Sequence, residues 1–176
     1  MLKHAKGNLI DMAEQGLFDV IVHGCNCQNT MGSGIAKEIK ERYRNAWEAD
    51  YNYKLDVDSE RPPPVMKLGS FSRTSAVRPN GMTFIIVNAY TQVNYLPRGV
   101  DHFEYESFYL ILKKLEALEG ILYRQPRPDN PGFRFGFPYI GMGLAGGDST
   151  RIIAMLENFA ARVTESGSTV TLVEFG

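Results

Sequence analysis

The stretch DVIVHGCNCQNTMGSGIAK, from Asp19 to Lys37, decides the predicted fold. Asp19 to Gly24 (DVIVHG), with Val20 to Val22 apolar, is a strand candidate, and a polar loop follows. Gly32-Ser33-Gly34 then opens an amphipathic helix that we expect from Gly34 to Arg44. Glycine lets the backbone approach a ligand closely, and the first amides of a helix lack internal partners. A phosphate at this helix start would gain several donors and a favourable helix dipole. The same glycines also fit a simple turn with a glycine N-cap.

A second glycine-rich stretch repeats this arrangement. The strand expected from Phe133 to Ile140 runs into GMGLAGG, from Gly141 to Gly147, and Asp148 or Ser149 is expected to cap the next helix. Ligands of parallel α/β sheets bind at the carboxyl ends of the strands. Two glycine loops at that edge can hold a diphosphate from both sides.

Strands that alternate with helices predict a mostly parallel sheet between two helical layers. The further strands expected are Val65 to Phe71, Thr83 to Tyr90 and Thr169 to Phe175, and the further helices are Trp47 to Tyr53, Phe103 to Leu118 and Ser149 to Ser166. The proline-containing segments Asp56 to Pro64 and Gln125 to Gly132 are expected to be surface loops. Neither separates a piece large enough to fold alone, so one domain is expected over residues 1–176.

Composition excludes several classes of function. The 19 basic and 20 acidic residues give a formal charge of −1, which argues against stable nucleic-acid binding. The sequence has no signal-peptide core and no apolar run near the roughly 18 residues of a membrane span, so we expect a reduced, cytoplasmic monomer. Cys25 and Cys27 are too close in sequence for an ordinary disulfide. With His23 they could share a strand face and bind zinc, but zinc needs four ligands, so we expect buried cysteines and no metal or cofactor.

Together these stretches resemble the macro domain family. The resemblance rests on four segments in matching order, namely Lys6 to Leu9, Asp19 to Asn26, Met31 to Ala36 and Gly141 to Asp148, and it spans nearly the whole chain. It implies a three-layer α/β/α macro domain with a mixed, mostly parallel central sheet. It also implies that the ligand is ADP-ribose.

The resemblance assigns ligand contacts as well. Asn8 stands where macro domains usually carry an aspartate that accepts from the adenine amino group, and asparagine keeps an acceptor oxygen without the charge. The Leu9 amide would meet the adenine ring, Asn26 would bind the distal ribose, and Phe175 would pack either on the adenine or in the core. The implied ligand-binding residues are Asn8, Leu9, Asn26, Gly32, Ser33, Gly34, Ile35, Thr91, Gly141, Met142, Gly143, Leu144, Ala145, Gly146 and Phe175.

Within the family, the stretch from His23 to Cys27 looks most like the fungal ADP-ribose 1″-phosphatase branch and its phage relatives. A histidine and an aspartate are the expected catalytic pair in that branch. Hydrolysis of a phosphate monoester needs a proton for the leaving oxygen and a nucleophile or base. His23 is the candidate histidine, with a core histidine bonded to the backbone as the alternative. Asp101 is the candidate carboxylate and His102 comes next, although Asp101 with Glu104 also fits a helix N-cap.

The resulting prediction is a phosphatase that converts ADP-ribose 1″-phosphate to ADP-ribose and phosphate. Gln92 follows Thr91 at the position where hydrolases that remove ADP-ribose from DNA bases or glutamate side chains carry a lysine, which disfavours the lysine-dependent mechanism. Two alternatives stay open. One is an ADP-ribosyl hydrolase acting on protein, nucleic acid or O-acetyl-ADP-ribose through a positioned water, and the other is a reader that binds ADP-ribose without turnover.

Overall fold

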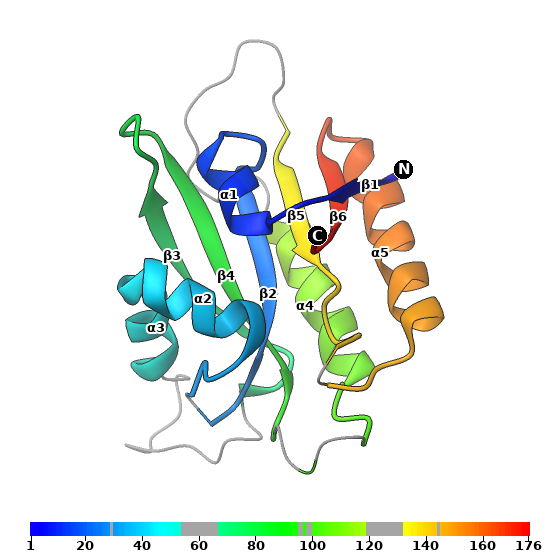
Figure 1. The fold of residues 1–176 in the computed structure, drawn as a ribbon. Coiled ribbons are helices and arrows are strands. Elements are labelled where there is room, and N and C mark those ends of the chain that lie inside the picture. Colours follow the sequence, from blue (N-terminus) through cyan, green and yellow to red (C-terminus); the bar gives the residue numbers. More distant parts are fainter. Residues whose placement is uncertain (29, 54–66, 95–96, 98–99, 119–131, 144) are drawn as a thin grey trace.

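The computed structural model describes residues 1–28, 30–53, 67–94, 97, 100–118, 132–143 and 145–176. Within them lies one sheet of six strands in the order β1-β6-β5-β2-β4-β3 (Figure 1). Its strands are β1 (Leu2–Lys6), β2 (Val20–Asn26), β3 (Phe71–Val77), β4 (Thr83–Gln92), β5 (Arg134–Pro138) and β6 (Thr169–Glu174). The helices are α1 (Leu9–Glu14), α2 (Gly34–Arg42), α3 (Arg44–Tyr51), α4 (Tyr105–Leu118) and α5 (Ser149–Thr164).

Helices cover both faces of this sheet. All strand pairs are parallel except β3 with β4, which is antiparallel. Figure 1 shows α1, α2 and α3 over one face and α4 and α5 over the other. Side chains of β2 alternate accordingly, because Val20 and Val22 pack in the core beneath α4 and α5, whereas Ile21 packs with α1 residue Ile10. The predicted three-layer α/β/α fold with a mixed, mostly parallel sheet is therefore confirmed.

Three elements were not predicted: α1 and the two edge strands, β1 and β3. β1 is LKHAK and β3 is FSRTSAV, and both strands expose several residues, so neither carries an apolar run. The strand predicted from Val65 to Phe71 is wrong where it is described, because residues 67–70 form a turn and the strand begins at Phe71. The loop predicted at 56–64 and residues 125–131 of the second loop lie outside the described residues.

Gly136 allows α1 and its flanking segments to approach β5 closely. A Cβ atom at this position would lie 2.8 Å from the ring of Phe18 and 2.9 Å from the side chain of Leu9. Any larger residue would have to push both side chains off the sheet. Glycine in β5 thus fixes the place of Asn8 and Leu9 beside the central strands.

In the described part of the chain, no helix combines the length and the hydrophobicity that crossing a membrane requires.

Candidate functional site

The first glycine loop joins the end of β2 to the start of α2. Gly34 has φ +58°, and Met31, a buried non-glycine residue, has φ +42°. Ser33 is the N-cap residue of α2, and its side chain forms no capping hydrogen bond within the described residues. The amides of the first turn are therefore left for other acceptors, as an anion site requires.

The second glycine loop joins β5 to α5 and is held in a fixed shape. Gly141 has φ +73°, and a Cβ atom there would lie 2.3 Å from the ring of Phe103. The Gly141 carbonyl accepts a hydrogen bond of 2.7 Å from the Gly147 amide, which closes the loop. Asp148 is the N-cap of α5 and accepts a hydrogen bond from the Arg151 amide. The sequence had predicted either Asp148 or Ser149 at this position. Only glycine satisfies both the backbone and the space at 141.

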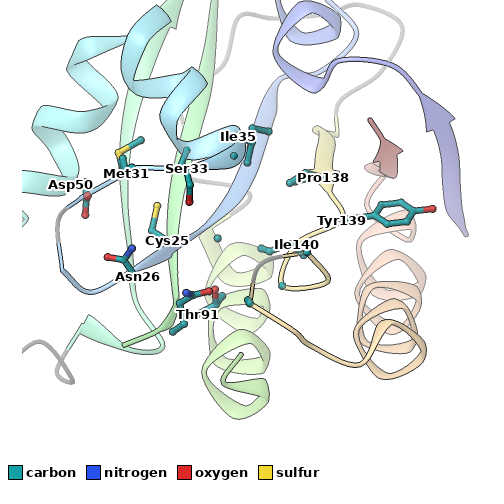
Figure 2. Close-up of a pocket in the computed structure, with 18 residues that line it drawn as sticks. Cys25, Asn26, Met31, Ser33, Ile35, Asp50, Thr91, Pro138, Tyr139 and Ile140 are labelled. Atoms are coloured by element: carbon teal, nitrogen blue, oxygen red, sulfur yellow. The ribbon is translucent and has the colours of Figure 1, made fainter. Parts of the chain in front are cut away.

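A cavity of about 300 Å³ lies between the two loops, and we call it the central cavity (Figure 2). β2, β4, β5, both loops and α3 contribute to it. Its lining consists of Gly24, Cys25, Asn26, Met31, Gly32, Ser33, Gly34, Ile35, Ala36, Asp50, Thr91, Gln92, Pro138, Tyr139, Ile140, Gly141, Gly143 and Ala145.

A second cavity of about 440 Å³ adjoins the first, and we call it the α1 cavity. It shares Gly34, Ile35, Pro138 and Tyr139 with the central cavity, so the two adjoin, and we call them together the cleft. Its other lining residues are Gly7, Asn8, Leu9, Glu38, Val173 and Phe175. The cleft thus has an end at α1, a middle between the glycine loops, and a far end near Asp50.

The Asn8 side chain makes hydrogen bonds that the sequence did not predict. Its Oδ1 accepts hydrogen bonds of 2.9 and 3.0 Å from the amides of Ile10 and Asp11, which makes Asn8 the N-cap of α1. Its Nδ2 donates to Glu38 Oε1 at 3.0 Å. The acceptor oxygen expected to face an adenine is therefore already used. Glu38 brings a carboxylate into the same cavity instead.

Phe175 follows β6 and lines the α1 cavity. The residue is 81% exposed, so the alternative of core packing is wrong. An exposed ring beside a cavity can stack on a flat ligand.

The far end of the cleft carries polar side chains from β2 and β4. Asn26 Oδ1 accepts from the Gln28 amide at 2.8 Å, and Asn26 Nδ2 donates to Thr30 Oγ1 at 3.0 Å. Thr91 is buried and borders the same space. Both residues are thus positioned where the sequence expected ligand contacts, and their roles in binding stay predictions.

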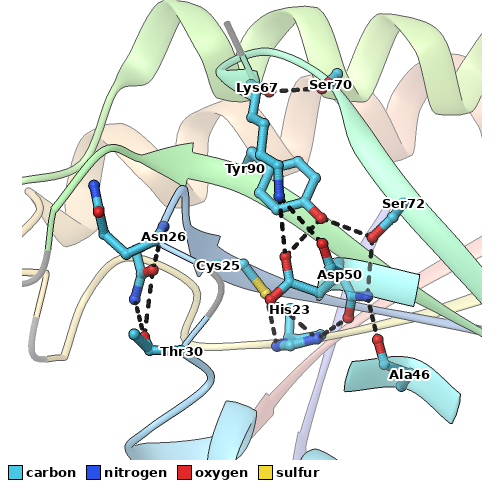
Figure 3. A network of polar contacts seen from close by, with 12 residues as sticks. His23, Cys25, Asn26, Thr30, Ala46, Asp50, Lys67, Ser70, Ser72 and Tyr90 are labelled. Carbon is cyan, nitrogen blue, oxygen red and sulfur yellow. Dashed lines mark hydrogen bonds and ion pairs between the residues drawn. The ribbon is translucent and has the colours of Figure 1, made fainter. Parts of the chain in front are cut away.

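His23 is fully buried and does not line either cavity. Its Nε2 lies 2.6 Å from Asn88 Oδ1. Asn88 Nδ2 donates to Ala46 O and Ser72 Oγ, so Asn88 Oδ1 is the acceptor and His23 Nε2 carries the proton. Burial lowers the pKa of His23 to about 4, against the effect of the hydrogen bond to Asn88. This position matches a satisfied core histidine, bonded to a side chain rather than to the backbone (Figure 3).

Asp101 and His102 lie behind the second glycine loop and do not line the central cavity. Asp101 accepts from the Phe103 amide at 3.0 Å and from Tyr105 Oη at 2.7 Å. The His102 amide donates to Ala145 O at 2.8 Å, and its ring contacts Pro97 O. Helix α4 begins only at Tyr105, so the predicted N-cap at Asp101 is wrong. These residues support the loop from outside.

Most predicted ligand-binding residues do line the cleft: Asn8, Leu9, Asn26, Gly32, Ser33, Gly34, Ile35, Thr91, Gly141, Gly143, Ala145 and Phe175. Met142 and Gly146 belong to the loop but not to the lining, and Leu144 lies outside the described residues. The sequence missed Asp50 and Glu38, which come from helices. Only helix packing brings them to the strand ends, and no local motif indicates that.

Cys25 and Cys27 are buried and unpaired, as predicted. Burial raises the pKa of Cys27 to about 12 and that of Cys25 well above its ordinary value, so both are thiols at neutral pH. Within the described residues, no three His, Cys, Asp or Glu side chains form a group that could hold a metal ion.

Comparison with known proteins gives one sequence relative and several similar structures. No protein-family model matches the sequence. An uncharacterized 17.5 kDa protein in the tk-vs intergenic region of Enterobacteria phage T4 is 27% identical over 163 residues, which cover 93% of this chain and 92% of the phage protein. The macrodomain of Mycobacterium tuberculosis DarG superposes with a TM-score of 0.67 at 15% identity over 98% of this chain and 97% of that one. Thermosipho africanus DarTG in complex with ADP-ribose gives a TM-score of 0.64 at 13% identity over 98% of this chain and 41% of that one.

These structural similarities show that the chain has the macrodomain fold. The fold implied by the resemblance to macro domains is therefore confirmed.

The burial of His23 predicts a pH-dependent stability. The pKa of His23 in the folded protein, about 4, lies below the ordinary value of 6.5. The unfolded chain therefore takes up the proton first, so the stability contributed by the neutral His23 is fully present above pH 6.5 and is lost as the pH falls toward 4. That loss amounts to about 3 kcal/mol of unfolding free energy. Urea denaturation at pH 7 and pH 4 should therefore show a smaller difference in His23→Gln than in the wild type. His4→Gln, at an exposed position, should keep the wild-type difference. Equal pH dependence in His23→Gln and wild type would contradict this account.

Proposed function

We propose that this protein binds ADP-ribose along the cleft. The adenine would occupy the α1 cavity, the diphosphate would lie between the two glycine loops, and the terminal ribose would reach the end near Asn26 and Thr91. One observation carries the proposal: the two cavities adjoin, with four lining residues in common, and both glycine loops line the central one.

The chemistry of each part of the cleft supports this orientation. Phe175 offers an exposed ring, and Glu38 offers a carboxylate that can accept from an adenine amino group. The first turn of α2 offers backbone amides and the positive end of a helix dipole to a diphosphate. A chain with a formal charge of −1 can therefore bind an anion without a cluster of basic side chains.

A solved structure with the same fold also supports the proposal. The Thermosipho africanus protein that shares this fold was solved in complex with ADP-ribose. At 13% identity the likeness does not extend to individual residues. The assignment of ligand parts to this cleft is ours, and it rests on the residues named above.

A bulky side chain at Gly143 should block binding without unfolding the protein. Gly143 lines the central cavity, and nothing within 4 Å would meet a Cβ atom there. We expect calorimetric titration with ADP-ribose to give micromolar affinity for the wild type and at least a tenfold loss for Gly143→Val. Gly143→Ala should bind more nearly like the wild type, and both variants should melt at the wild-type temperature. A wild type that binds no ADP-ribose would refute the proposal.

We further propose that the bound molecule is turned over, with ADP-ribose 1″-phosphate as substrate and ADP-ribose and phosphate as products. The likeness of the His23 to Cys27 stretch to the phosphatase branch supports this reaction, and so does the absence of a lysine at Gln92. His23 and Asp101 are not carried forward as the catalytic pair, because neither lines the central cavity. The reacting groups must then come from the cavity lining or from a bound water.

Turnover is tested by a comparison of substrates. We expect phosphate release from ADP-ribose 1″-phosphate and no release of ADP-ribose from ADP-ribosylated DNA or protein. Release from modified DNA or protein alone would identify an ADP-ribosyl hydrolase. Micromolar binding of ADP-ribose with no turnover of any of the three would identify a reader.

A further inference from the structure

Residues 100–105 lead into α4 and pack against the second glycine loop, and we call them the supporting segment. The His102 amide donates to the Ala145 carbonyl at 2.8 Å. A Cβ atom at Gly146 would lie 2.9 Å from the Val100 carbonyl oxygen, so the two backbones are in close contact. The loop and the segment therefore touch through backbone atoms at two points.

The supporting segment is itself fixed to the rest of the protein. The Glu104 amide donates to the Thr91 carbonyl at 2.7 Å, and Thr91 lies near the end of β4. The Phe103 ring is buried in the core beneath α4 and α5. Because both attachments are to rigid parts of the fold, the segment gives the loop a fixed backing.

The hydroxyl of Tyr105 connects this segment to the end of the loop. Tyr105 Oη donates to Asp101 Oδ2 at 2.7 Å and accepts from the Asp148 amide at 2.9 Å. Asp148 follows the loop directly and is the N-cap of α5. The Arg151 guanidinium lies 3.9 Å from the centre of the Tyr105 ring and keeps the ring beside the start of α5. One hydroxyl group thus joins the segment, the loop and the helix that follows.

Tyr105 does not line either cavity, whereas Gly141, Gly143 and Ala145 of the loop line the central one. Four of the seven loop residues are glycine. A chain so rich in glycine has many accessible backbone conformations, and ordering it during binding would cost free energy. A loop that is fixed beforehand avoids most of that cost.

We propose that Tyr105 is a positioning residue, whose hydroxyl holds the second glycine loop in its binding shape before the ligand arrives. This inference rests on the proposed binding of ADP-ribose, because the loop is assigned to the diphosphate. Part of the affinity for the ligand then comes from groups outside the cleft. Asp101 contributes by accepting the hydrogen bond from Tyr105, which requires no contact with the ligand.

A purely structural role of the hydroxyl leads to a different expectation. Its removal would lower the melting temperature and leave the affinity of the folded protein unchanged, because every folded molecule would still present the same loop. A positioning role instead changes the affinity of the folded protein and the local order of the loop.

The test compares Tyr105→Phe with Tyr109→Phe. Phenylalanine at 105 keeps the ring beside Arg151 and removes only the hydroxyl. Tyr109 is the matched control, because it lies on the same helix, has Lys113 Nζ 5.7 Å from the centre of its ring, and does not line the cleft.

Two measurements are made on the wild type and on both variants, at a temperature where thermal melts show each to be folded. Calorimetric titration with ADP-ribose gives the affinity. Hydrogen exchange without ligand gives the protection of the Gly147 amide, whose bond to the Gly141 carbonyl closes the loop. The amides of β2 report on opening of the whole fold.

We expect Tyr105→Phe to weaken ADP-ribose binding about three- to tenfold, which corresponds to the loss of one hydrogen bond. Exchange of the Gly147 amide should become about threefold faster or more, while the β2 amides exchange as in the wild type. Tyr109→Phe should match the wild type within about twofold in both measurements.

An unchanged affinity in folded Tyr105→Phe, or a loss that Tyr109→Phe shares, would overturn the inference. So would a loss of affinity with unchanged exchange at Gly147, or with equally faster exchange in β2, because the loop would then not be the link. In each of these cases the wild type still binds ADP-ribose, and the proposed function stands. A wild type that binds no ADP-ribose would refute the proposed function, and this inference with it.

Discussion

The cleft depends on one constraint: backbone amides and glycines must meet at the carboxyl edge of the sheet. β2 and β5 both end there, and the two glycine loops lead from them into α2 and α5. The second loop keeps its shape because Gly141 packs against the ring of Phe103 and its carbonyl binds the Gly147 amide. A site made of backbone groups needs neither a metal nor an excess of basic residues to attract a diphosphate. The near-neutral composition of the chain is consistent with that design.

The central strands of the sheet could be predicted from the sequence, whereas the two edge strands could not. Runs such as Phe84 to Val87 are apolar on both faces, because helices cover β4 on both sides, and this pattern is visible without a structure. β1 and β3 are edge strands with exposed residues, so they lack the apolar run. Asn8 was placed correctly beside the cleft, but its role as the N-cap of the six-residue helix α1 was not foreseen.

The burial of His23 was not foreseen for a related reason. Residue type and distance along the chain suggested His23, three residues before Asn26. Alternation along β2 instead directs His23 toward the face covered by α1 to α3, where it bonds Asn88. Asp50 reaches the cleft through the packing of α3, which no spacing in the sequence encodes. Titratable groups at strand ends can be predicted from a motif, whereas groups contributed by a packed helix require the tertiary structure.

A crystal structure of the protein with ADP-ribose tests the central claim most directly. The account predicts adenine density between Leu9 and Phe175, the diphosphate between the Gly32–Ile35 and Gly141–Ala145 segments, and the terminal ribose at the end of the cleft near Asn26 and Thr91. Density for the nucleotide elsewhere on the molecule, or a cleft left empty at saturating ligand, would contradict it.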